Sequence, residues 1–351
     1  MENSPNNKII VIGAGIVGAS LAYHLATKGA QVTLIEAQDI ACGVTATSFA
    51  WINTTYPAPD PIAQLRGAAI QEYHRLEAQL PGLQIRWTGA LTYGAAPVPS
   101  ANRISRSQIL DLEPNLKHPP EQASHAAEEG ALDAVAATHA LVKGAQAHGA
   151  KVLTQTRVLG FATQGDQVTG VETARGFIAA DTVVLAAGTG TAKLAKMLGA
   201  ALPINASPAI FIRYKTHPNL VQTLISSPEM EVRHGAGGTL LAAEDYLDDT
   251  PENQPMAIAL RTAEAIQNEL HGVVSIEPEL ACVGLRPMPA DGIPIIGYLP
   301  QVGGVYVCAM HPGVMLAAVV GRLASEEIID GKAPSGFGPC RPDRFVRSLA
   351  T

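Results

Sequence analysis

The sequence predicts an α/β protein. A parallel-sheet domain is assembled from separate segments, and a smaller α+β domain with an antiparallel sheet is inserted between them. Three observations support this prediction. The chain opens with a strand, a glycine turn, a helix and a second strand over residues 8–36. Apolar stretches of similar character return at residues 182–187 and from residue 305 onward. The intervening stretches alternate in hydrophobicity, as antiparallel strands do.

The first segment is a glycine turn between a buried strand and a helix. Residues 9–12 are apolar and precede a G-x-G-x-x-G motif that begins at Gly13, and residues 16–28 then have helical periodicity. A second strand, residues 31–35, ends at the acidic Glu36. A glycine pattern in this context is typical of Rossmann-like dinucleotide-binding folds.

Each residue type in this motif has a chemical reason. The start of a helix offers unpaired N–H groups and the positive end of its dipole to a pyrophosphate. Gly13 permits the tight turn, Gly15 lets the phosphates approach, and Gly18 lets the helix pack close to the strand. Glu36 can accept hydrogen bonds from ribose hydroxyls and would repel a 2′-phosphate.

The overall composition excludes several classes of function. A net charge of −7 and 5% aromatic residues argue against nucleic acid as a partner. The four cysteines lie far apart and match no zinc-ligand spacing, so we expect reduced thiols, no metal and a cytoplasmic protein. The apolar run from Val305 is interrupted at His311 and Pro312, so no membrane span is expected.

The remaining elements follow along the chain. Helices are expected over residues 63–79, 138–148 and 263–270, from Thr191, and in a last helix that ends near Ile329. Strands are expected over residues 151–154, 158–163, 167–173, 177–179, 182–187, 209–215, 230–234 and 238–243.

This order predicts a nucleotide-binding fold built from three separate segments of the sequence. A nicotinamide dehydrogenase domain would usually run its strands without such long breaks, so the split favours a flavoprotein whose insertions cover the flavin. We expect residues 1–84, 130–202 and 281–351 to form the FAD-binding domain. Residues 85–129 and 203–280 would form the substrate domain.

Four segments together carry a family resemblance. They are VIGAGIVGASLAYHLATKGAQVTLIE, GVTATS at residues 43–48, EEGALDAVAATHALVKGAQAHGAKV with TVVLAAGTGT, and GLRPMPADGIPIIG at residues 284–297 with VYVCAMHPGVMLAAVVGRLASEEI after it. The chain thereby resembles the D-amino-acid oxidase superfamily of FAD-dependent oxidoreductases, and within it the glycine oxidase and sarcosine oxidase branch. The likeness spans nearly the whole chain and is weak over residues 200–280.

The resemblance implies where FAD would bind. The implied cofactor-binding residues are Gly13, Ala14, Gly15, Ile16, Val17, Gly18, Glu36, Ala37, Gly43, Thr45, Ala46, Thr47, Ser48, Val158, Ala187, Gly188, Arg286, Asp291, Gly292, Pro312, Gly313, Val314 and Met315. The start of the last helix would point at the flavin and stabilise negative charge on the reduced ring. Because no cysteine falls in the matching part of GLRPMPADG, the FAD is expected to be non-covalent.

The implied reaction is oxidation of the C–N bond of an amine or amino acid. A hydride would pass to flavin N5, and the imine would hydrolyse in water; such a transfer needs orientation more than a catalytic base. Arg286 is the candidate for gripping a substrate carboxylate, because its planar guanidinium can form two parallel bonds. His311, the second candidate catalytic residue, would contact substrate or flavin, or cap the last helix.

Several alternatives remain at this stage. The electron acceptor is O₂ or an electron carrier, and the chain is a homo-oligomer, a dehydrogenase subunit of a heteromeric complex, or a non-catalytic dinucleotide-binding module. The substrate itself is a small amine or amino acid of unknown identity. The residues most able to line its pocket are Trp87, Tyr214, Arg233, His234 and Tyr246.

Overall fold

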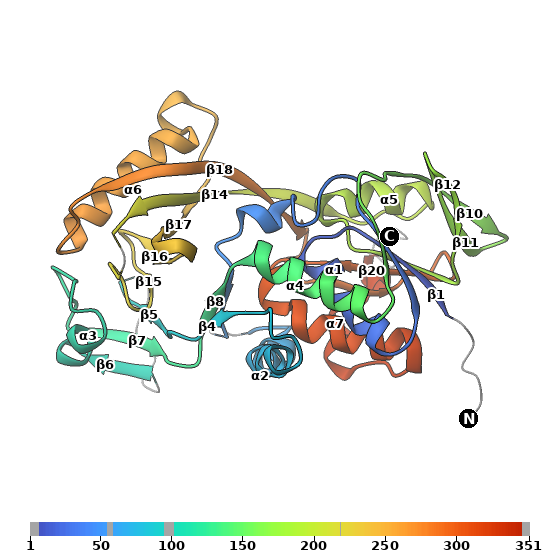
Figure 1. Cartoon of the computed structure of the whole chain (residues 1–351), viewed down its shortest axis with the longest axis horizontal. Helices are drawn as coiled ribbons and strands as arrows, with labels where there is room; N and C mark the ends of the chain where they lie inside the picture. Colours follow the sequence, from blue (N-terminus) through green and yellow to red (C-terminus); the bar gives the residue numbers. More distant parts are fainter. Residues whose placement is uncertain (1–6, 55–58, 95–101, 218, 346–351) are drawn as a thin grey trace.

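The computed structural model describes residues 7–54, 59–94, 102–217 and 219–345. They form two lobes joined by one pair of long antiparallel strands, β14 (Ile204–Thr216) and β18 (Ile276–Pro289) (Figure 1). One lobe contains a mainly parallel sheet, and the other contains the end of a larger, mostly antiparallel sheet.

The parallel sheet has six strands. Their order is β19 (Ile295–Tyr298), β20 (Val305–Ala309), β13 (Thr182–Leu185), β1 (Lys8–Ile12), β2 (Gln31–Ile35) and β9 (Lys151–Leu153). Only the edge strand β19 runs antiparallel to its neighbour. The sheet is buried on both faces, which explains why its strands are apolar without alternation.

Helices and a small sheet cover the two faces of the parallel sheet. Ile9 and Val11 point into a core that includes α1 (Ile16–Thr27), α2 (Ala63–Gln79), α4 (Ala134–Ala147) and α7 (Gly313–Asp330). Ile10 and Ile12 point into a second core, with α5 (Thr191–Met197) and the three-stranded sheet of β10 (Val158–Gln164), β11 (Gln167–Thr173) and β12 (Gly176–Ala179).

The larger sheet has eight strands. Its order is β18, β14, β17 (Leu240–Asp245), β16 (Glu231–His234), β15 (Leu224–Ser226), β5 (Ala90–Thr92), β7 (Gln122–Ala126) and β6 (Arg103–Ser105). Helix α6 (Pro255–Glu269) packs on the face that carries Ile210 and Val232. A short helix, α3 (Arg106–Leu112), follows β6, and a three-stranded sheet of β3 (Trp51–Ile52), β8 (Gly130–Leu132) and β4 (Ile85–Arg86) lies at the junction (Figure 1).

Some element bounds differ from the expectations for physical reasons. The helix expected from residue 138 begins at Ala134, because the Asp133 side chain caps it by accepting the Ala136 N–H at 2.9 Å. The helix expected from residue 263 begins at Pro255, a residue that tolerates the first helical position. The boundary expected between residues 280 and 281 falls inside β18, since that strand continues from one lobe to the other.

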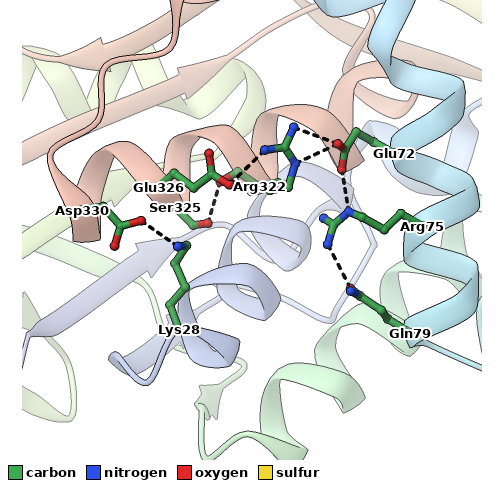
Figure 2. Close-up of polar contacts among 8 residues, drawn as sticks. All are labelled: Lys28, Glu72, Arg75, Gln79, Arg322, Ser325, Glu326 and Asp330. Carbon is green, nitrogen blue, oxygen red and sulfur yellow. Dashed lines mark hydrogen bonds and ion pairs between the residues drawn. The ribbon is translucent and has the colours of Figure 1, made fainter. Parts of the chain in front are cut away.

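Ion pairs connect α1, α2 and α7 on the side away from the parallel sheet (Figure 2). The Glu72 carboxylate forms ion pairs with Arg322 Nη2 at 2.8 Å and with Arg75 Nε at 2.9 Å. Lys28 Nζ lies 2.8 Å from the Asp330 carboxylate. His24 is buried behind this network, and its Nε2 has no hydrogen-bond partner within the described chain. No helix in the described ranges has the length and apolar character that a bilayer span requires.

Candidate active site

The two lobes enclose a cavity of about 940 Å³. Its walls come from the first glycine turn, the loop after β2, the end of β13, the face of the eight-stranded sheet opposite α6, and the start of α7. The sequence-predicted residues that line it are Gly13, Gly15, Ile16, Val17, Glu36, Ala37, Gly43, Thr45, Thr47, Ser48, Val158, Ala187, Gly188, Arg286, His311, Pro312, Gly313, Val314 and Met315.

Three predicted residues support the wall from behind. The Ala14 N–H donates to Glu36 Oε2 at 2.8 Å and thereby positions that carboxylate. Gly18 lies against the turn, where an added Cβ would sit 1.9 Å from the Gly13 carbonyl oxygen. Ala46 belongs to the 3₁₀ turn Val44–Thr47, whose other residues line the cavity.

Asp291 and Gly292 lie outside the cavity lining, although both were predicted to hold the cofactor. The Asp291 carboxylate pairs with Arg344 Nε at 2.8 Å and accepts the Ile293 N–H at 3.0 Å. Its hydrogen-bonding capacity is therefore used to fix the turn before β19, and the geometry separates this turn from the remaining predicted residues.

The glycine turn forms a cradle without side chains. Gly13 has a φ of 106°, and a Cβ there would lie 2.4 Å from the Ala186 carbonyl oxygen, so only glycine fits. Gly188, with a φ of 56°, lines the cavity from the facing strand end, and a Cβ there would project into open space. Helix α1 then begins at Ile16, whose N–H donates to Thr45 Oγ1 at 3.2 Å.

Glu36 is fixed at the cavity wall by backbone donors. Its Oε2 accepts the Ala14 N–H and its Oε1 accepts the Gln38 N–H, at 2.8 and 2.9 Å. A carboxylate has about four lone-pair positions, so capacity remains for a pair of ribose hydroxyls.

The lining residues fit FAD. The open cradle at the start of α1 would accept phosphates, and Arg157 and Lys193 add positive charge to the same cavity. At the other end, α7 begins at Gly313 without a side-chain cap and without an acidic residue in its first turn. Its positive end therefore faces the cavity unneutralised, as an electron-rich reduced ring would need.

Arg286 reaches the cavity from β18 and is held by neutral acceptors. Its Nη2 donates to Ser207 Oγ at 3.0 Å and to the Pro208 carbonyl at 3.2 Å. Among the ion pairs of the described residues, none involves Arg286. The guanidinium charge is therefore available to an anionic group in the cavity.

His311 lines the cavity beside Arg286. Burial, together with the positive charges of Arg286 and Arg66, lowers the pKa of His311 to about 4. The imidazole is therefore neutral near pH 7. One ring nitrogen can then accept a hydrogen bond.

Sequence reasoning missed much of the wall formed by the eight-stranded sheet. Phe211, Glu231 and Ala243 line the cavity from three of its strands. Hydrophobic alternation could have placed each residue on one face of its strand. It could not have said which face of the sheet meets the six-stranded lobe.

None of the five residues suggested for the substrate pocket lines the cavity. Tyr214 is in the core below α6, where its hydroxyl donates to the Ala259 carbonyl at 2.7 Å. Arg233 is buried and donates to the Phe49 and Leu132 carbonyls, so it anchors the loop after the 43–48 turn.

The fold and this cavity define a flavin-dependent oxidoreductase of two lobes. The family model described as DAO, FAD dependent oxidoreductase, matches residues 8–327, and the chain belongs to this family. It is 25% identical over 358 residues to a glycine oxidase from Pseudomonas aeruginosa, which covers 94% of this chain and 96% of that protein.

Solved structures share the fold. The L-proline dehydrogenase from P. horikoshii has a TM-score of 0.86 and 22% identity, with 98% of each chain covered. The glycine oxidase from Bacillus cereus has a TM-score of 0.81 and 21% identity, with 93% of this chain and 96% of that chain covered.

Proposed function

We propose that this protein uses FAD to oxidise the C–N bond of a small amine that carries a carboxylate, most simply an amino acid. The observation that carries the proposal is the position of Arg286. Its guanidinium, which forms no ion pair within the described part of the chain, lines the same cavity as the glycine cradle and the start of α7. The names of the relatives, a glycine oxidase and an L-proline dehydrogenase, support the same substrate class.

Bound FAD would supply the hydride acceptor. The chain itself would orient the substrate: Arg286 would bind its carboxylate in a two-bond fork and thereby fix the position of the α-carbon. His311, neutral at pH 7, would accept a hydrogen bond from the amine nitrogen. Thr45 and the start of α1 would hold the pyrophosphate, and Glu36 the ribose.

We also propose that the six-stranded lobe holds the cofactor and the eight-stranded lobe covers the substrate, in a cytoplasmic enzyme with non-covalent FAD. Cys42 and Cys308 line the cavity as free thiols. Burial raises the pKa of both, with Glu36 adding to the effect at Cys42, so both stay protonated and poorly nucleophilic. Acid precipitation should therefore release FAD into the supernatant, whereas a yellow pellet would contradict non-covalent binding.

The test is anaerobic mixing of the purified holoenzyme with a panel of amines and amino acids. Loss of the oxidised-flavin absorbance near roughly 450 nm reports substrate oxidation. Replacing Arg286 by alanine should raise KM for carboxylate substrates on the order of 100-fold, because two charge-assisted hydrogen bonds are lost.

A matched control is Arg213→Ala. Arg213 lies on β14, next to β18, and pairs with the exposed Glu279 at 2.7 Å, away from the cavity lining. Its replacement should leave KM unchanged. Equal KM values for the Arg286→Ala variant and the parent protein would remove Arg286 from the site, and a panel without any flavin reduction would overturn the proposed function.

A further inference from the structure

Glu231 is an acidic side chain in the roof of the cavity. It lies on β16, and within the described residues the cavity lining contains one other acid, Glu36, which is held at the glycine turn. Phe211 and Ala243, paired across β14 and β17, lie beside it on the same wall. The mechanism above gives Glu231 no task.

The carboxylate of Glu231 has few partners. Ser226 Oγ donates to its Oε2 at 3.4 Å, and among the described residues no Lys, Arg or His forms an ion pair with it. Burial, together with the negative charges of Glu244 and Asp245, raises the pKa of Glu231 to about 7, against the opposing effect of the Ser226 hydrogen bond. A carboxylate in such surroundings is stabilised by any cation that enters.

Two fully buried glutamates of this protein are satisfied in ways that the half-buried Glu231 is not. Glu113 accepts the N–H groups of Gln222 and Thr223 and joins two loops. Glu129 accepts Trp51 Nε1 at 2.9 Å and stabilises the strand after the 43–48 turn. Within the described residues, the hydrogen bond that Glu231 accepts is the long one from Ser226, its neighbour across β15 and β16, which leaves most of the acceptor capacity of this carboxylate unused.

Glu231 and Arg286 give the cavity two ends of opposite charge. Along the strands, Arg286 on β18 lies opposite Ser207, which is four residues from Phe211 on β14. Across the sheet, β16, which carries Glu231, is the third strand from β18. With about 3.4 Å per residue and 4.8 Å per strand, their Cα atoms would be about 20 Å apart on a flat sheet. The two side chains span only part of this distance, so a molecule that touches both would carry its two charged groups several bonds apart.

We propose that Glu231 selects substrates with a second, cationic group: amino acids whose side chain ends in an ammonium or a guanidinium. This inference rests on the proposed function, with the α-carboxylate at Arg286 and the distal cation at Glu231. The distal contact determines which amine is oxidised and takes no part in the hydride transfer.

The experiment compares pairs of amino acids that differ in the distal charge. Lysine is paired with norleucine and arginine with citrulline, each as both enantiomers, in anaerobic flavin reduction by the holoenzyme at pH 8. The cationic member of a pair should have a kcat/KM on the order of 10- to 100-fold higher. Glu231→Gln should abolish this preference by slowing the cationic member alone, and Glu231→Asp, which keeps the charge, should retain part of it.

Glu279→Gln is the matched control, since Glu279 lies exposed on β18 and outside the cavity lining. It should leave the preference unchanged. Equal kcat/KM values within each pair for the parent protein would overturn the inference, even if Glu231→Gln did not fold. Reduction only by the amino acids with uncharged side chains, norleucine and citrulline, would overturn it and leave the proposed function standing, whereas an unreactive panel would remove both.

Discussion

Replacing Gly18 by alanine should weaken FAD binding, although the new residue is the best helix former. An ideal Cβ at Gly18 would lie 1.9 Å from the Gly13 carbonyl oxygen and 3.4 Å from the Ala186 Cβ. Gly13 cannot move away freely, because the position of its own missing Cβ is 2.4 Å from the Ala186 carbonyl oxygen. The methyl group must therefore displace the turn that we propose to hold the pyrophosphate.

The size of the effect follows from overpacking. Inserting a methyl group into a filled site costs about 1–3 kcal/mol. If the displaced turn must be restored for binding, Kd for FAD rises about 5- to 150-fold, at about 1.4 kcal/mol for each tenfold change. The assay is titration of the apoprotein with FAD, followed by quenching of flavin fluorescence, together with thermal unfolding with and without FAD.

Gly67→Ala provides the same chemical change in a different place. Gly67 is exposed in α2, and nothing lies within 4 Å of its added Cβ. That variant should gain up to about 1 kcal/mol of stability and bind FAD as the parent protein does. A Gly18→Ala variant with the parent Kd and the parent unfolding midpoint would refute the reasoning about close packing at this turn.

Two further predictions concern the helices behind the parallel sheet. Glu72→Gln should lower the free energy of unfolding by about 1–2 kcal/mol in urea titrations, because Arg75 and Arg322 lose a shared, largely buried counter-charge (Figure 2). An unchanged urea midpoint would show that these ion pairs contribute nothing to stability. Burial and the cations Arg75, Arg322 and Lys28 together lower the pKa of His24 from 6.5 to about 3. Below pH 6.5 the unfolded chain therefore binds a proton at His24 that the native protein does not, and the native protein loses stability as the pH falls. Between pH 6 and 4, the free energy of unfolding of the parent protein should therefore fall more steeply than that of the His24→Leu variant, by up to about 1.4 kcal/mol per pH unit. Equal slopes for the two proteins would contradict this assignment.

Much of the fold was predictable because its signals are local. The glycine turn, the strands on either side and α1 are contiguous in sequence, so their periodicities and the G-x-G-x-x-G spacing already determine their arrangement. The hairpin of β10 and β11 and helix α2 were predictable for the same reason. Element ends were less predictable, since Asp133 and Pro255 extend their helices beyond the apolar repeat.

The site divides in the same way. The sequence by itself determined the proposed cofactor cradle, because residues 13–18 and Glu36 lie within one strand–helix–strand unit. Tertiary structure alone decided the cavity wall proposed to meet the substrate, where Phe211, Glu231 and Ala243 come from three strands whose cavity face depends on how the sheet packs against α6. It also decided that Asp291 pairs with Arg344 away from the cavity, since an ion pair between residues 53 positions apart leaves no trace in a local pattern.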